Sequence, residues 1–229
     1  MSRAVHDEGE PSAVGVGGPD PHGAETGGEH GPGPRPGEGN LGAGGTGLGV
    51  TWAGGTGAGP DDDGGREVRQ AVGQAALGGV VARVTQPYRV RGGRAPGSAA
   101  RQDAAWLEIA AVLREMFPGI PLVQGGRSNG ARLACRTARA AGARGVVALA
   151  FPLHPPGHPE RSRLAELRAA GARVLVVNGA RDPFGVPDAA AADRVVVLPG
   201  EAHSLAASPA AVTSAVGTWL REALGLGPP

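Results

Sequence analysis

Residues 120–141, IPLVQGGRSNGARLACRTARAA, decide the fold of this chain. They open on a short apolar run, pass through Gly126-Arg127-Ser128-Asn129-Gly130, and end in a segment whose small apolar residues recur at helical spacing. The run predicts a strand over 120–124, and the last segment predicts a helix over 129–141. A serine between glycines at a sharp strand-to-helix turn presents its hydroxyl, which is the G-x-S-x-G pattern of a nucleophile elbow.

Beyond about residue 45, short β-branched runs alternate with longer segments of helical period, which predicts parallel βαβ units. Loops are expected around Pro87 and Pro96 and over 152–159. The expected fold is α/β, with a mostly parallel sheet flanked by helices. Strands are predicted over 48–52, 80–84, 120–124, 146–150, 173–178 and 194–198, and helices over 66–77, 102–116, 129–141, 161–170 and 209–224.

The N-terminal part has a different composition. Residues 1–45 are rich in Gly, Pro, Glu and His and have no apolar periodicity, so we expect a disordered low-complexity segment before one domain over 46–229. The first strands of such a sheet are hard to find there, and the fold is expected to have reduced or missing first strands. Either the domain is trimmed at that edge, or these residues are not authentic coding sequence.

Charge and cysteine content restrict the partners. The 22 basic and 21 acidic residues are mixed and leave a net charge of +1, so no patch for nucleic acid or an anionic membrane is expected. Cys135 is the only cysteine, which excludes an internal disulfide. The chain shows neither a signal-peptide core nor a membrane-spanning run, so we predict a cytoplasmic protein without a membrane partner. The oligomeric state is left open.

A serine nucleophile needs a base, and the base needs an orienting acid. Asp182 follows the strand predicted over 173–178, and His203 follows the one over 194–198. Carboxyl ends of parallel strands meet at one edge of a sheet, so both should lie near Ser128. The chain order Ser, Asp, His is that of α/β-hydrolases. We therefore predict a catalytic triad of Ser128, Asp182 and His203.

Two further side chains are candidates for substrate binding. Arg127 either contacts an acidic group of the substrate or packs against its own helix. His154 stands in the proline-bounded loop after the strand over 146–150 and is expected to line the pocket. His154 and His158 have no carboxylate or cysteine set nearby, so no metal site is predicted. Triad chemistry requires no cofactor.

Four strings carry a resemblance to a known family. The sequence resembles small bacterial α/β-hydrolases of the dienelactone-hydrolase-like clan, and it is similar to the hydrolase-like domain in a subunit of the animal NSL histone-acetyltransferase complex. The resemblance implies an α/β-hydrolase fold with Ser128, Asp182 and His203 in the triad positions, and it leaves the substrate undefined. The strings are Thr85-Gln86-Pro87-Tyr88-Arg89, GGRSNGAR over 125–132, PLHPPG over 152–157, and GARDPFG over 179–185.

One departure from the family concerns the oxyanion hole. Members usually carry His-Gly-Ala-Gly after an early strand, which supplies a second backbone amide to the oxyanion. The matching positions here are Thr56-Gly57-Ala58-Gly59. Because the donor is a backbone amide, loss of the histidine does not remove it. The expected oxyanion hole is formed by amides of Asn129 and of Gly57, Ala58 and Gly59.

These observations predict a serine hydrolase that cleaves a small-molecule carboxylic ester, thioester or lactone through an acyl-enzyme. With three Phe, one Tyr and three Trp, a large aromatic pocket is not expected, which favours a small or polar substrate. The alternative is a non-catalytic α/β-hydrolase-fold scaffold for protein interaction. The likeness to a chromatin-complex subunit and the altered loop favour the scaffold, whereas the complete triad opposes it.

Overall fold

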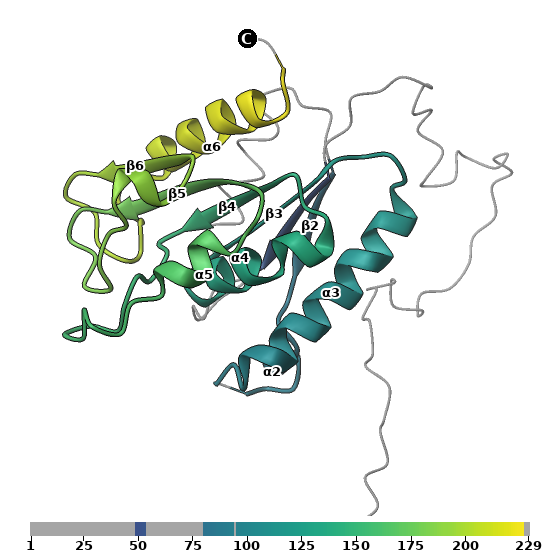
Figure 1. The fold of residues 1–229 in the computed structure, drawn as a ribbon, viewed down its shortest axis with the longest axis horizontal. Coiled ribbons are helices and arrows are strands. Elements are labelled where there is room, and N and C mark those ends of the chain that lie inside the picture. Colours follow the sequence, from purple (N-terminus) through teal and green to yellow (C-terminus); the bar gives the residue numbers. More distant parts are fainter. Residues whose placement is uncertain (1–48, 54–79, 94, 227–229) are drawn as a thin grey trace, which may run out of the picture. The chain divides into compact units, whose positions relative to one another are not determined.

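The computed structural model of the chain describes residues 49–53, 80–93 and 95–226 (Figure 1). All of them belong to one unit, Gly42–Pro229. The segment 1–45, the helix predicted over 66–77 and the glycine loop Gly57–Gly59 lie outside the described residues. The prediction of a domain boundary near residue 46 therefore stays a prediction.

Six strands form one parallel sheet in the order β2-β1-β3-β4-β5-β6, which confirms the predicted fold class. Figure 1 shows the arrowheads of β4, β5 and β6 pointing the same way, so their carboxyl ends share one edge. The strands are β1 (Gly49–Ala53), β2 (Val80–Val84), β3 (Leu122–Arg127), β4 (Gly145–Leu149), β5 (Arg173–Gly179) and β6 (Arg194–Leu198).

The strand order reverses at β1. The chain passes from β1 to β2 on one side and then returns to β3 on the other, so β1 lies between them. Ligands of open α/β sheets bind beyond the carboxyl ends of the strands at such a switch point. Ala53 at the end of β1 is in register with Gly126, two residues before Ser128. The candidate nucleophile therefore stands at the position where the topology favours a site.

Helices cover both faces of the sheet. Figure 1 shows α6 on one face and α4, flanked by α3 and α5, on the other. The short helix α2 follows β2, and a 3₁₀ turn precedes β6. The helices are α2 (Pro87–Val90), α3 (Ala99–Met116), α4 (Asn129–Ala141), α5 (Leu164–Arg168) and α6 (Pro209–Ala223), and the 3₁₀ turn is Ala189–Ala191.

Alternate residues of the central strands supply two cores. Because successive side chains of a strand point to opposite faces, β4 contributes Val147 and Leu149 to one core and Val146 and Ala148 to the other. Toward α6 the strands pack on Val212, Val216, Trp219, Leu220 and Ala223. Toward α4 they pack on Ala131, Ala134, Cys135 and Ala138. Strands buried on both faces explain the continuous apolar runs in the sequence.

Several elements differ from the prediction. A helical turn, α2, replaces the loop expected at Pro87, because proline at the first helical position has the required φ and needs no N–H partner. Helix α3 begins at Ala99, where the Ser98 hydroxyl accepts from Arg101 N at 3.4 Å. Strand β3 continues to Arg127, and α5 covers only five residues.

No helix in the described part of the chain is long and apolar enough to cross a membrane.

Candidate active site

The turn between β3 and α4 holds Ser128 in a strained conformation. Its φ is 55° and its ψ is −115°, outside the backbone regions that non-glycine residues favour. Ser128 N donates to Leu149 O of β4 at 3.0 Å, which anchors the turn to the sheet. A Cβ at Gly126 would lie 2.8 Å from Gly130 Cα, so a side chain there would collide with the first turn of α4. The flanking glycine of the motif is therefore a steric requirement.

The loop after β5 fixes Asp182. Its carboxylate is fully buried, and Oδ1 accepts from Phe184 N at 2.9 Å. Asn178, the penultimate residue of β5, donates from Nδ2 to Asp182 Oδ2 at 3.5 Å and to Gly185 O at 3.2 Å. Asn178 Oδ1 also accepts from Phe151 N at 2.8 Å, which ties the loop to the end of β4. The acid is thus held by a buried amide.

The loop after β6, which contains His203, packs against the loop after β5, which contains Asp182. Arg181 N donates to Glu201 O at 2.8 Å, and the Arg181 guanidinium donates to Gly200 O. A Cβ at Gly179 would lie 2.6 Å from Ala202 O, so only glycine lets the two backbones approach this closely. The sequence places Asp182 and His203 after neighbouring strands, and these contacts bring them together.

Ser128, His203 and Asp182 form one line of hydrogen bonds. His203 Nε2 lies 2.9 Å from Ser128 Oγ, and His203 Nδ1 lies 2.8 Å from Asp182 Oδ2. A carboxylate only accepts, so Nδ1 carries a proton, and Nε2 is left to accept from the serine hydroxyl. The Phe184 ring lies against the imidazole, with centroids 4.4 Å apart and planes at 37°. The arrangement matches that of a nucleophile, a general base and an orienting acid.

Backbone strain gathers at the same edge of the sheet. Of the non-glycine residues that the structure describes, three have a positive φ: Ser128 at 55°, Ala150 at 46° and Leu205 at 52°. Ser128 follows β3, Ala150 follows β4, and Leu205 lies in the loop that carries His203. Such conformations cost on the order of 1–3 kcal/mol each and persist where the surroundings determine them. Strain at these three turns supports this edge as the candidate functional one.

Comparison with known proteins agrees with this geometry. Residues 48–207 match the family described as "Alpha/beta hydrolase domain". The chain belongs to the α/β-hydrolase family. No curated protein matches the sequence.

Solved structures share the fold of this α/β hydrolase. A hydrolase of the alpha/beta superfamily from Xanthomonas campestris is 22% identical, with a TM-score of 0.58, over 76% of this chain and 99% of its own. Est1E from Butyrivibrio proteoclasticus is 14% identical, with a TM-score of 0.59, over 78% and 88%. XC6422 from Xanthomonas campestris is 19% identical, with a TM-score of 0.55, over 79% and 84%.

One of the predicted oxyanion donors is described in this α/β hydrolase. Asn129 is the first residue of α4, and the first N–H groups of a helix have no partner within it. Its amide therefore stands beside Ser128 at the positive end of the helix dipole, which suits a developing oxyanion. The Gly57–Gly59 loop is not described, although β1, which precedes it, pairs directly with β3.

The structure describes both of the predicted substrate-binding residues. Arg127 ends β3 immediately before the nucleophile and is half-buried. His154 is also half-buried, and its backbone N donates to Phe184 O at 2.9 Å. A Cβ at Gly185 would lie 2.8 Å from the His154 ring atom Cδ2, so His154 packs closely on the loop of the acid. Substrate contacts by Arg127 and His154 stay predictions.

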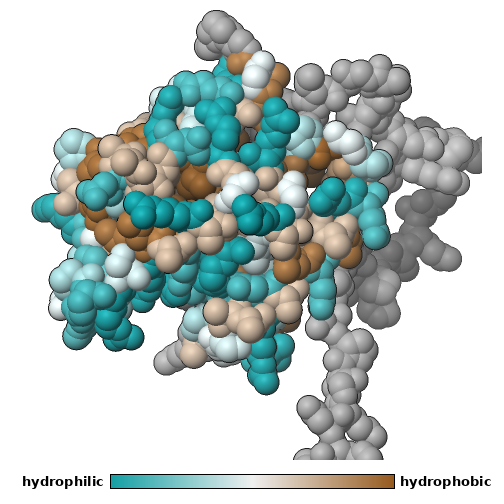
Figure 2. Space-filling model, viewed as in Figure 1, coloured by the Kyte–Doolittle hydropathy of each residue, from teal (hydrophilic) through white to brown (hydrophobic). Residues whose placement is uncertain are grey.

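The loop that carries His154 is polar at its tip. Residues 156–162 are exposed, and Figure 2 shows hydrophilic side chains gathered on the corresponding projection at the lower left. His158 lies in this exposed stretch, and its Nδ1 contacts Glu160 Oε1 at 3.1 Å. Within the described ranges, no three His, Cys, Asp or Glu residues are grouped so that they could hold a metal ion.

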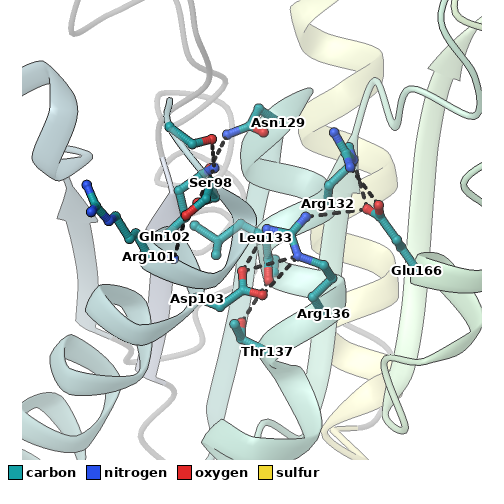
Figure 3. Close-up of polar contacts among 12 residues, drawn as sticks. Ser98, Arg101, Gln102, Asp103, Asn129, Arg132, Leu133, Arg136, Thr137 and Glu166 are labelled. Carbon is teal, nitrogen blue, oxygen red and sulfur yellow. Dashed lines mark hydrogen bonds and ion pairs between the residues drawn. The ribbon is translucent and has the colours of Figure 1, made fainter. Parts of the chain in front are cut away.

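Ion pairs fix α4 between its neighbouring helices (Figure 3). Arg132 donates to both carboxylate oxygens of Glu166 in α5, at 2.8 and 2.6 Å. Arg136 donates to Asp103 of α3 at 2.6 Å and to Glu166 at 3.4 Å. Burial disfavours the charged form of Glu166, but the two arginines outweigh burial and hold its pKa below the ordinary value. The helix behind the nucleophile is thus held from both sides.

Two features of the site were missed by sequence reasoning. Asn178 and Phe184 support Asp182 and His203, yet neither stood out as a functional residue in the sequence. Phe184 follows the Asp182-Pro183 pair, and this adjacency was the only available signal. Asn178 is fully buried and follows the apolar run 174–177 of β5, and a polar residue directly after such a run was the available signal.

Proposed function

We propose that this protein is a serine hydrolase that cleaves a carboxylic ester, thioester or lactone through an acyl-enzyme. The observation that carries the proposal is the continuous line from Asp182 Oδ2 through both ring nitrogens of His203 to Ser128 Oγ, with links of 2.8 and 2.9 Å. Membership of the α/β-hydrolase family supports hydrolysis as the reaction class. The description of XC6422 as a serine hydrolase without a lid supports the same chemistry on this fold.

The proposed reaction begins when Ser128 Oγ attacks the carbonyl carbon and its proton passes to His203 Nε2. The carbonyl oxygen becomes an oxyanion, which the Asn129 amide and the loop around Gly57–Gly59 would receive. Asp182 accepts from Nδ1–H and stabilises the imidazolium. The intermediate collapses, the C–O or C–S bond breaks, and the imidazolium protonates the leaving alcohol or thiol.

Deacylation repeats these steps with water. His203 Nε2 takes a proton from a water molecule that attacks the acyl carbon, and a second oxyanion forms in the same place. Its collapse breaks the bond to Ser128 Oγ, which regains its proton from the imidazolium and releases the carboxylic acid. The cycle uses only side chains and amides of the chain, so the proposal includes no cofactor.

Four aromatic side chains lie in the core rather than at the surface, which favours a small or polar substrate. Trp106, Trp219, Phe151 and Tyr88 are all buried in the core. The Phe184 ring lies against His203 of the triad. The exposed loop over 156–162 belongs to the segment that follows the carboxyl end of β4. The proposed membership of the dienelactone-hydrolase-like clan, whose name refers to a small polar lactone, agrees with this class.

The proposal is tested by intact-mass analysis after incubation with a fluorophosphonate, which reacts with activated serines. We expect one adduct on the wild type, and none on Ser128→Ala or His203→Ala. Ser204→Ala is the matched control, because Ser204 is exposed and adjacent to the base, and it should still be labelled. Circular dichroism establishes that each variant is folded. A folded wild type without an adduct contradicts the proposal and favours the scaffold alternative.

A further inference from the structure

A side-chain hydrogen bond joins the residue after the candidate nucleophile to the neighbouring helix. Asn129 Nδ2 donates to Gln102 Oε1 at 2.6 Å, although the two lie 27 positions apart (Figure 3). Gln102 is in the first turn of α3, and only 6% of its surface is exposed. A short hydrogen bond to a buried amide restricts Asn129 more than contact with solvent would.

The orientation of the Gln102 amide is fixed by α3 itself. Its Nε2 donates to Ser98 O at 3.2 Å and to Gly97 O at 3.4 Å. Because carbonyl oxygens only accept, the NH₂ group of Gln102 must face them, and Oε1 must face Asn129. The N-terminus of α3 therefore determines which atom Asn129 meets.

Asn129 is the residue whose position matters most to the proposed oxyanion hole. It is the first residue of α4, and its peptide N–H belongs to the same peptide unit as the carbonyl of the strained Ser128. An oxyanion donor is effective only when it is held at the right distance before the charge develops. We propose that Gln102 is a positioning residue that holds, through the side chain of Asn129, the peptide N–H that receives the oxyanion. This inference rests on the proposed function.

A control variant can test whether Gln102 merely helps α3 to pack on α4. The adjacent residue, Asp103, also contacts α4, through Arg136 at 2.6 Å. Arg136 lies about two helical turns beyond Ser128. Removing the Asp103 side chain weakens the same helix pair far from the elbow, whereas removing the Gln102 side chain releases the residue next to the nucleophile.

The experiment measures p-nitrophenyl acetate hydrolysis by the full chain and by Gln102→Leu, Asn129→Ala, the double variant and Asp103→Leu. We expect Gln102→Leu to lower kcat about tenfold with little change in KM, less than the 10²–10³ typical of losing an oxyanion donor altogether. The double variant should be no slower than the slower single variant, because both remove one bond. Asp103→Leu should keep kcat within about twofold of the wild type.

Binding of an alkyl trifluoromethyl ketone gives a second readout, since its adduct with Ser128 places an oxyanion in the same position. Its affinity should fall with kcat in Gln102→Leu and hold in Asp103→Leu. Equal kcat losses in these two variants, wild-type kcat in Gln102→Leu, or additive losses in the double variant would each overturn the inference. If Gln102→Leu does not fold, the kcat values of Asn129→Ala and Asp103→Leu are compared instead. A larger loss in Asn129→Ala supports the inference, and equal losses overturn it. A wild type without a fluorophosphonate adduct contradicts the proposed function, whereas a labelled wild type with unaffected variants contradicts this inference alone.

Discussion

His203 Nε2 lies 2.9 Å from Ser128 Oγ, although 75 residues separate them along the chain. The other nitrogen of the ring lies 2.8 Å from Asp182. A single imidazole therefore connects the loops after β3, β5 and β6. Any change that displaces the ring should alter activity more than stability, because the loops are also held by their own backbone contacts.

Replacing Asp182 by asparagine should leave the fold intact and reduce turnover. The asparagine oxygen can still accept from Phe184 N, but its amide would donate to Nδ1 and favour the wrong tautomer of His203. We expect kcat for p-nitrophenyl acetate to fall by on the order of 10⁴. Steady-state kinetics with circular dichroism as the folding control measures this. A loss of less than tenfold would contradict a triad role for Asp182.

Phe184→Ala should lower kcat moderately. The ring packs on His203 at a centroid distance of 4.4 Å, and an aromatic pair contributes about 0.5–1.5 kcal/mol beyond burial. We therefore expect roughly a two- to twelvefold loss of kcat. Phe184→Tyr keeps the ring and serves as the control with near wild-type turnover. Equal kcat values for the alanine and tyrosine variants would show that the ring contact has no role.

Glu166 should contribute a pH-dependent part of the stability. Its pKa is lowered in the folded state, because Arg132 and Arg136 outweigh the effect of burial. A depressed pKa stabilises the fold fully above the ordinary value of 4.5, and this contribution is lost as pH falls through the folded value. Urea denaturation between pH 7 and 3 should give a flatter free-energy profile for Glu166→Gln below about pH 4.5. Parallel profiles would refute the assignment.

Cys135 should be unreactive in the folded protein. Burial raises the pKa of its thiol to about 12, so the nucleophilic thiolate is scarce at neutral pH. Incubation with iodoacetamide at pH 8 should leave the native mass unchanged, whereas the same treatment in denaturant should add one carbamidomethyl group. Modification of the native protein at a comparable rate would mean that the core around α4 opens readily.

Much of the fold was predictable because the hydrophobic periodicity of the segments agrees with the positions of the Gly and Pro residues between them. The helix over 129–141 and the strands over 80–84 and 194–198 match the structure residue for residue. Strand β3 was predicted over 120–124 but spans Leu122–Arg127; its end was placed too early because Gly125 and Gly126 favour a turn. Pairing of β3 with β1 and β4 on either side overrides that preference. The predicted helix over 161–170 was too long, because the Ser162 hydroxyl and Arg163 N are engaged in loop contacts.

The candidate site was predictable only where topology determines it. Ser128, Asp182 and His203 each follow a strand of a parallel sheet, so their meeting follows from chain order. The contacts of Phe184 with His203 and of Gln102 with Asn129 depend on how side chains pack across loops and helices. Nothing in the spacing of these residues encodes such packing, and a single sequence does not reveal it.

Helix α6 has a consequence for synthesis of the protein. Its residues Val212, Val216, Trp219 and Leu220 pack on one face of the sheet, and they leave the ribosome after His203. A nascent chain interrupted between His203 and α6 would contain the whole candidate triad on a sheet that lacks the apolar cover of α6. Such a chain presents the surface that chaperones and proteases recognise. Cellular quality control would therefore recognise such incomplete chains by the exposed core that α6 covers in the whole protein.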